Sequence, residues 1–431
     1  MTDSTAPTAD PAAIVPAVAA DRAPLLPRDL FAPDVESLRE PPARRTRLDS
    51  VDILRGLVMV IMALDHTRDY FHNAAFQFDP TDLTRTNAPL FFTRWITHFC
   101  APVFVFLAGT GAFLSLGRGK TKRELSWFLV TRGAWLILLE VTLVRLGWTF
   151  DVRYHFIWVQ VIWVLGWSMI ILAGLIHLPS WLLTAFGAVL VAGHNLLDRV
   201  RAADFGHFDL LWQFLHEQGA QHWGAPPPNG FTFMIAYPLV PWVGVMALGY
   251  SFGRLLQLPE ARRRRTLFRL GLALTLAFII LRATNLYGDP QPWSAQSTPG
   301  FTLLSFINCQ KYPPSLLYLL MTLGPAIMLL PLLERWTGAV ARFFLTFGRV
   351  PLFYYLLHVP VIHVLVVACA VARYGPQVLQ VDASQGPPPG WGYPLAVVYL
   401  VWLVTVLLLY PLCRRWARLK QRNRSAWLSY L

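Results

Sequence analysis

Long apolar runs alternate with short polar segments between residues 50 and 413. A helix that spans a membrane needs roughly 20 consecutive, mostly apolar residues, and a window of that length finds about ten such runs. The pattern therefore predicts an all-α fold, a polytopic transmembrane bundle of about ten helices. The expected spans are residues 50–66, 96–116, 124–146, 154–175, 180–197, 232–254, 265–284, 312–333, 347–372 and 391–413.

Some segments fall outside this simple series. Residues 339–372 are longer than one span, and Gly348 and Pro351 can break a helix, so a further short helix would make about eleven. Residues 1–43 are rich in Ala, Pro and Asp without a long apolar run, which predicts a disordered cytoplasmic tail. The remainder is a transmembrane domain, residues 44–415, and a basic cytoplasmic tail, residues 416–431.

The composition excludes a soluble protein. Of the residues, 55% are hydrophobic and only 14% are charged, whereas soluble domains have about 25% charged residues. The net charge of +13 would suit nucleic acid. However, the Lys and Arg residues gather in short clusters between apolar runs, so we expect the lipid bilayer as partner and no nucleic acid.

The basic clusters fall in alternate loops, which orients the helices. Loops containing residues 118–123, 254–265 and 335–342, with the C-terminal tail, are rich in Lys and Arg, and the intervening loops are nearly balanced or acidic. Because basic loops face the cytoplasm, both termini are expected there. The longer loops then lie outside.

The first span carries unusual polar residues. Asp52 and Arg55 are three residues apart and can pair on one helix face. His66 follows Arg55 by eleven residues, about 16 Å of helix, so Asp52, Arg55, Met59, Met62 and His66 form one stripe. The alternative is an interfacial anchor pair with a histidine at the headgroups.

A second group of polar residues should gather at the outer end of this span. Asp65, His66, Asp69 and His72 lie close together in sequence, and His98 opens the next span, which the connecting loop returns to the same side. A histidine near a carboxylate can act as a general base. These residues could also bind a metal, but their spacing matches no zinc motif, so no metal is expected.

Other polar residues are candidates for binding a substrate. Asn308 and Lys311 precede the eighth span, where Lys311 either binds a polar acceptor or reaches toward the headgroups. His358 lies within the ninth span, and a neighbouring carbonyl, freed by Pro360, could satisfy its ring. The remaining loop histidines, His207, His216 and His222, are expected to be solvated.

Several motifs together resemble a known family. They are Arg47–Gly56 leading into Leu64-Asp-His66, Ala101–Gly109, Tyr237–Tyr250, Lys311–Ser315 and Gly348–His358. Over roughly residues 44–415, they resemble the heparan-alpha-glucosaminide N-acetyltransferase-like membrane acyltransferases, in particular a bacterial branch often labelled a domain of unknown function. The resemblance implies a multi-pass protein of a bacterial inner membrane. Its implied activity is transfer of an acetyl group from cytosolic acetyl-CoA to an acceptor across the membrane, which in the lysosomal members is the amine of a terminal glucosamine.

The resemblance leaves the catalytic base open between His66 and His72. Related membrane O-acyltransferases have an Arg-Gly start and a His eleven residues after that Arg, as Arg55 and His66 do here. The lysosomal members instead have Asn at the position of His66, an acidic residue at that of His98, and a catalytic His in the next loop, where His72 is nearest.

We therefore expect an acetyltransferase with His66 as principal base. Asp65 or Asp69 would orient it, and His72 would assist. His98, Asn308, Lys311 and His358 would bind the acceptor, an amine or hydroxyl of an extracytoplasmic sugar or another small molecule. Arg55 and Asp52 would lie near the pantetheine or phosphates of acetyl-CoA.

Two other functions compete with this one. A transporter could use Asp65, His66 and His358 as a proton relay, and a membrane scaffold would need no site. A transporter should show repeat symmetry and polar residues along several helices, whereas here they concentrate at the outer ends of two spans. An acyltransferase also requires a tunnel from the cytoplasm to His66. The protein could also form a homo-oligomer, which the sequence neither predicts nor excludes.

Overall fold

The computed structural model describes residues 48–75, 77–117, 119–225, 229–380, 388, 390–423, 428 and 430. The predicted tail, residues 1–43, lies outside the described residues. The longer helices are α1 (Asp49–Phe71), α2 (Ala88–Trp95), α3 (Cys100–Leu116), α4 (Lys122–Leu139), α6 (Val161–Leu175), α7 (Ser180–Gly193), α8 (Asp209–Leu215), α9 (Leu239–Phe252), α10 (Glu260–Thr284), α11 (Pro299–Ile307), α12 (Leu316–Leu333), α13 (Gly338–Arg349), α14 (Pro351–Tyr374) and α15 (Leu395–Arg422). Shorter pieces are the 3₁₀ turns η2 (Ile96–Phe99), η4 (His194–Leu197), η5 (Ala202–Phe208), η6 (Leu255–Gln257) and η7 (Pro376–Gln380), the π turn η3 (Glu140–Val144) and α5 (Arg145–Thr149).

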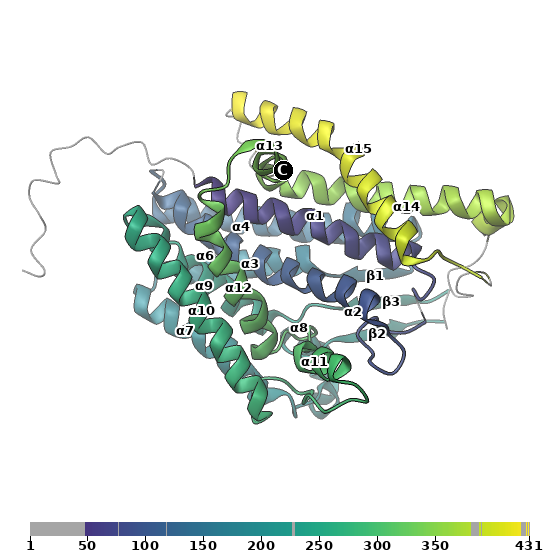
Figure 1. The fold of residues 1–431 in the computed structure, drawn as a ribbon, viewed down its shortest axis with the longest axis horizontal. Coiled ribbons are helices and arrows are strands. Elements are labelled where there is room, and N and C mark those ends of the chain that lie inside the picture. The colour runs from purple at the N-terminus through teal and green to yellow at the C-terminus, as the bar shows by residue number, and fades with distance from the viewer. Residues whose placement is uncertain are drawn as a thin grey trace, which may run out of the picture. The chain divides into compact units, whose positions relative to one another are not determined.

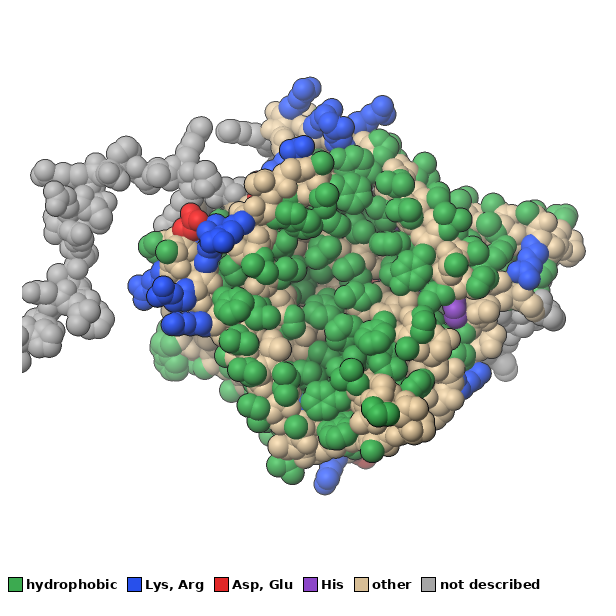
Figure 2. Space-filling view, viewed as in Figure 1, with side chains coloured by type: hydrophobic (Ala, Val, Ile, Leu, Met, Phe, Trp, Pro, Cys, Tyr) green, Lys and Arg blue, Asp and Glu red, His purple; other side chains and the backbone are tan. Residues whose placement is uncertain are grey.

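The helices have the length and surface of membrane spans. Within the described residues, eight helical segments are long and apolar enough to cross a membrane. The apolar helix α6 is shorter, and α1 carries several charges. Figure 2 shows a broad hydrophobic face, with Lys and Arg gathered toward two of its edges. The prediction of a helical membrane bundle is confirmed in this coarse form, although length and hydropathy alone do not establish ten spans.

A small sheet replaces the expected beginnings of two spans. β1 (Phe156–Val159) and β3 (Phe231–Ile235) are parallel and pair Phe156 with Thr232, and β2 (Gly219–Trp223) runs antiparallel to β3. The order is β1-β3-β2. A short apolar run such as 156–159 cannot be distinguished by pattern from the first turn of a buried helix. The all-α prediction was therefore wrong for these strands.

The break predicted in the long segment 339–372 is present. α13 ends at Arg349 and α14 begins at Pro351, with Val350 between them at φ −134° and ψ 49°. A proline disfavours helical geometry in the residue before it and is well tolerated in the first helical turn. The further short helix is α13. At the other end of the chain, α15 continues to Arg422, so part of the segment predicted as a tail is helical.

α1 lies in the middle of the bundle. It packs against α3, α12, α13, α14 and α15, and Figure 1 shows it running between α3 and the α14–α15 pair. Its contact with α13 is the closest kind, backbone against backbone. A Cβ at Gly56 would overlap the carbonyl oxygen of Phe344, and one at Gly348 would overlap that of Asp52. This contact fixes α13 beside the beginning of α1.

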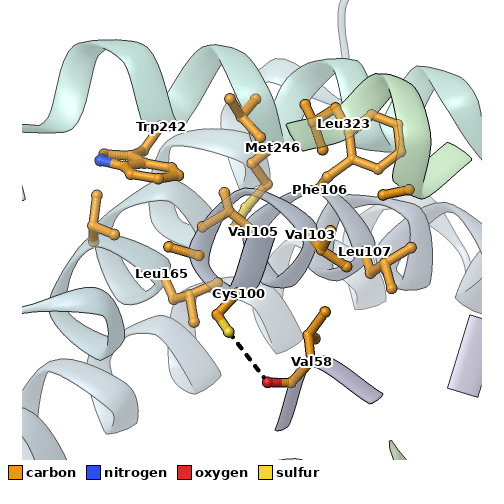
Figure 3. Packing of buried hydrophobic residues seen from close by; sticks show 14 of the residues in the cluster. Val58, Cys100, Val103, Val105, Phe106, Leu107, Leu165, Trp242, Met246 and Leu323 are labelled. Carbon is orange, nitrogen blue, oxygen red and sulfur yellow. Dashed lines mark hydrogen bonds between the residues drawn. The ribbon is translucent and has the colours of Figure 1, made fainter. Parts of the chain in front are cut away.

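The core between α1, α3 and α9 is tightly packed. Figure 3 shows Phe106 and Val105 of α3 near Met246 and Trp242 of α9, and the Trp242 side chain is completely buried. Cys100 donates a hydrogen bond from Sγ to the Val58 carbonyl at 3.3 Å. This hydrogen bond and the surrounding apolar contacts join α3 to the middle of α1.

Two buried arginines organise the loops at the sheet end of the bundle. Arg145 donates to the Phe156 carbonyl at 2.7 Å and to the Asp151 carboxylate at 2.6 Å. Arg282 donates to the carbonyls of Phe306 and Asn308 at 2.8 and 2.7 Å. Burying an arginine is favourable only when its donors are satisfied, so each guanidinium fixes the loop around it. Arg282 thus fixes the loop that carries Lys311.

Candidate functional site

A cavity of about 500 Å³ follows one face of α1. The cavity-lining residues of α1 are Val51, Asp52, Arg55, Met62, Asp65 and His66, and Leu48 just before the helix also lines it. From Asp52 to His66 the helix rises about 21 Å. The predicted stripe is therefore largely present, but Met59 is completely buried and does not line this cavity.

The two ends of the cavity differ in chemistry. We name the two ends after Arg55 and His66. The Arg55 end contains three further cationic lining residues, Arg132, Arg349 and Lys420. Asp52 and Arg55 pair there at 2.8 Å, as their spacing predicted. The opposite end, the His66 end, is also lined by Gln160, Tyr237, Lys311 and Tyr355. The Arg55 end thus offers several cations, and the His66 end offers an imidazole, neutral polar groups and the Asp65–Lys311 pair.

His66 forms a pair with His358 of α14. Its Nδ1 lies 2.7 Å from His358 Nε2, and His358 Nδ1 lies 2.9 Å from the Tyr354 carbonyl oxygen. A carbonyl can only accept, so His358 Nδ1 carries a proton, and in a neutral ring its Nε2 is then the acceptor. His66 must therefore donate from Nδ1. This leaves the lone pair of His66 on Nε2, the tautomer that a general base needs.

Aromatic rings complete the surroundings of His66. Trp148 lies edge-on, with ring centroids 4.7 Å apart, and Tyr355 lies at 6.1 Å. A backbone carbonyl does satisfy His358, as expected, but it is that of Tyr354 and not that of Leu356, which Pro360 deprives of its usual amide donor. His358 itself is fully buried and, among the described residues, is not part of the cavity lining. It contacts His66 and not the space where a substrate would lie.

Asp65 is the centre of an ion cluster. It pairs with Arg68 at 2.9 Å and with Arg94 of α2, and Lys311 Nζ lies 4.0 Å away. Asp69 pairs with Arg68 at 2.6 Å. Both carboxylates are therefore engaged by arginines, and within the described residues the hydrogen bond that orients the His66 ring is the one with His358. Lys311 is held at the cavity by Asp65.

The other candidates of the predicted site lie elsewhere. His72 follows α1, where its Nδ1 accepts from the Ala74 amide at 3.1 Å. Burial, helped by Arg68, lowers the pKa of the His72 ring. His98 is buried beside Tyr318, at a ring distance of 5.4 Å. Asn308 donates to the Thr81 carbonyl at 3.0 Å. Within the described chain, none of the three lines the cavity.

Sequence reasoning missed several lining or supporting residues. Arg94 lay in what was expected to be a loop. Gln160 and Tyr237 lay in expected spans, and Tyr237 began one of the family motifs, but neither was predicted as a site residue. Glu140 did give a signal, because an ionisable residue inside an apolar span usually has a function. Its carboxylate accepts the amides of Gln160 at 2.9 Å and Trp163 at 3.1 Å. Glu140 thus caps the start of α6 and positions Gln160.

A comparison with known families matches more than half of this chain. A family model described as heparan-alpha-glucosaminide N-acetyltransferase, catalytic, matches residues 47–286, which is more than half of the 431 residues. The match covers α1 to α10 and includes Asp52, Arg55 and His66. Lys311 and His358 lie beyond it. Comparison with curated proteins found no match.

Proposed function

Because the chain belongs to the heparan-alpha-glucosaminide N-acetyltransferase catalytic family, we propose that it transfers an acetyl group from cytosolic acetyl-CoA to an amine or hydroxyl of an extracytoplasmic sugar. One structural observation supports the donor and acceptor named here, in addition to the family match. The same cavity reaches the cationic Arg55 end and the His66 end, so a donor and an acceptor entering from opposite sides could meet within it.

The Arg55 end suits the phosphates of acetyl-CoA. Arg55, Arg132, Arg349 and Lys420 come from α1, α4, α13 and α15 and line the same space. Guanidinium groups bind phosphate oxygens through charge-assisted hydrogen bonds. Arg349 is also paired with Asp49 at 3.2 Å, which orients its side chain. In the proposal this end faces the cytoplasm, and the acetylated arm of the donor extends along α1 toward His66.

His66 Nε2 is the proposed base. It removes the proton from the attacking amine or hydroxyl as that atom bonds to the thioester carbonyl carbon. The tetrahedral intermediate then collapses, the carbon–sulfur bond breaks, and the proton passes from His66 to the departing CoA thiolate. His358 accepts from His66 Nδ1 throughout and keeps the ring in position.

Two residues can stabilise charge or bind the acceptor at the His66 end. Gln160 Nε2 is buried and, within the described residues, makes no hydrogen bond, so it can donate to the oxyanion of the intermediate. Lys311 lines the cavity beside Asp65 and can bind an acceptor hydroxyl. His72, His98 and Asn308, predicted to act on the acceptor, are not assigned a role in this proposal, because they lie outside the cavity lining.

The orientation follows from the basic residues. Arg262–Arg265 begin α10, and Arg414 and Arg415 lie near the end of α15. Loops rich in Lys and Arg face the cytoplasm. We therefore propose that the chain is a multi-pass protein of the inner membrane and that both termini lie in the cytoplasm.

The test uses purified full-length protein in proteoliposomes, with radiolabelled acetyl-CoA and amino or neutral sugars as acceptors. Label should reach a sugar with the wild type and with His207→Ala, a loop histidine on the surface. Label should fall at least about a hundred-fold with His66→Ala, since a positioned base contributes about that much or more. Activity that survives His66→Ala but not His72→Ala would move the base to His72. Failure to label any sugar, together with no hydrolysis of acetyl-CoA, would reject the proposed function.

A further inference from the structure

Three potential metal ligands converge between α7 and β2, away from the cavity. His194 begins η4, Asp198 directly follows it, and His216 follows α8. One ligand atom from each side chain lies within 4.8 Å of the others. His194 and Asp198 are four residues apart, about one helical turn, so both side chains can leave the same side of the turn. His216 was expected to be solvated, but only 3% of it is exposed.

Among the residues that the structure describes, the imidazole of His194 makes no hydrogen bond of regular geometry, and its near neighbours are the His216 ring and the backbone of Pro314. The residue is 2% exposed, and within the described residues neither Nδ1 nor Nε2 makes a hydrogen bond. Buried polar groups in folded proteins are almost always paired, and an unpaired one calls for an explanation. A cation bound by either ring nitrogen would supply one.

The neighbouring side chains leave ligand atoms available. Asp198 accepts a hydrogen bond from Asn195 Nδ2 at 2.9 Å through Oδ2, and its Oδ1 lies 3.9 Å from His216 Nε2. His216 Nε2 donates to the His194 carbonyl at 2.9 Å. Binding a metal through this nitrogen would exchange that hydrogen bond for a metal bond and move the proton of the neutral ring to Nδ1.

We propose that His194, Asp198 and His216 bind a zinc ion, with water as the fourth ligand. Two imidazoles and one carboxylate form a common ligand set for zinc. The sequence predicted no metal, because the spacing of the residues around His66 matched no zinc motif and His216 was expected to be solvated. The three ligands come from the end of α7 and the segment before β2, and they do not line the cavity that the structure describes.

A bound zinc would also link segments that are distant in the sequence. Asn195, between the ligands, accepts the Leu316 amide at 2.9 Å through Oδ1, and Leu316 begins α12, just after the loop that carries Lys311. A bound ion would therefore join α7 and the segment after α8 to the start of α12. This inference does not depend on the proposed acetyltransferase activity.

The experiment measures zinc binding by the full-length protein, purified with a tag that contains no histidine. After treatment with a chelator, the protein is titrated with Zn²⁺ against a chromophoric competitor, and the bound metal is measured by mass spectrometry. Wild type and His207→Ala should bind about one zinc ion per chain, and His194→Ala well below one. His207 lies exposed in η5 of the same loop, which makes it a matched control.

Two further measurements protect the test against a variant that misfolds. Asp198→Asn keeps the size of the side chain and should weaken zinc binding by about ten-fold or more, because it removes a charged ligand. Zinc should raise the Tm of the wild type and of His207→Ala but not that of His194→Ala. Equal zinc uptake by wild type and both ligand variants, or none by the wild type, would overturn the proposal.

Discussion

At the scale of single residues, the proposed chemistry depends on which nitrogen of His66 carries a proton. The chain of contacts from the Tyr354 carbonyl through His358 to His66 assigns it to Nδ1. A substitution that removes the acceptor at position 358 would free the ring to rotate and to exchange tautomers. The contribution of His358 is therefore one of positioning.

We predict that His358→Leu lowers kcat by about a hundred-fold and changes KM for acetyl-CoA little, because the base is mispositioned while the donor site is intact. In His358→Gln, the side-chain oxygen can accept from His66 Nδ1, so it should retain more activity than His358→Leu. Nitrogen-15 NMR of the histidine rings gives a direct measurement, with a protonated Nδ1 expected for His66 in the wild type. Equal activity of His358→Leu and wild type would contradict a positioning role.

The ion cluster around Asp65 should contribute to the free energy of unfolding. Asp65→Asn should lower the free energy of unfolding by about 3–5 kcal/mol, because it leaves Arg68 and Arg94 buried without their common counter-charge. The matched control is Asp49→Asn, whose partner Arg349 lies near the surface and whose loss should cost less than about 1 kcal/mol. Unfolding in detergent micelles, followed by circular dichroism, measures both. A similar small loss in the two variants would show that Asp65 is not the centre of the cluster.

Sequence spacing found contacts within a helix but not those between distant segments. Asp52 and Arg55 pair as predicted because residues three apart share a helix face. His66 and His358 are 292 positions apart, and no periodicity connects them. The same holds for Asp65, whose partners Arg94 and Lys311 come from separate segments. Consequently Asp65 seemed free to orient His66, whereas arginines already engage it.

At the scale of elements, the glycine contact between α1 and α13 positions the Arg55 end. Arg55 Nη1 lies 3.4 Å from the Gly348 carbonyl oxygen, and Arg349 is the next residue. Any displacement of α13 would therefore move two of the cations assigned to the donor.

We predict that Gly348→Ala raises KM for acetyl-CoA about ten-fold and lowers the free energy of unfolding by about 1–3 kcal/mol, because the added Cβ forces the helices apart. Gly174→Ala in α6 is the control, since nothing lies within 4 Å of a Cβ built there. It should be neutral or stabilising by less than about 1 kcal/mol, because alanine favours helix. Steady-state kinetics and unfolding on the same preparations test both. An unchanged KM for acetyl-CoA in Gly348→Ala would show that the position of α13 does not affect donor binding.

Local signals also decided which elements could be predicted. Val350 and Pro351 marked the break between α13 and α14, since proline restricts the residue before it. β1 and β3 gave no such signal. Each is an apolar run of four or five residues that leads directly to a long apolar helix, and their pairing joins residues 76 positions apart in sequence, as Phe156 and Thr232 are.

At the scale of the whole molecule, the proposal requires a defined orientation in the membrane. We predict that a cysteine in place of His207 reacts with a membrane-impermeant maleimide in intact spheroplasts. A cysteine in place of Glu260, at the start of α10, should react only after permeabilisation, because the basic loops face the cytoplasm. Three native cysteines are buried and one is half-buried, so background labelling should be low. The reverse pattern would place acetyl-CoA at the wrong end of the cavity.

The ion cluster at the His66 end also has a consequence for the cell that makes this protein. A water-filled path open on both sides of a membrane would conduct ions and dissipate the proton-motive force. At the His66 end of the cavity, Arg68, Arg94 and Lys311 surround Asp65, and Asp69 pairs with Arg68, so three cations face two carboxylates. The excess positive charge of the cluster repels cations and protons, in the same way that cationic constrictions exclude them from selective pores. Loosening this cluster should therefore uncouple respiration and slow growth, even in cells that have no need of the acetylated product.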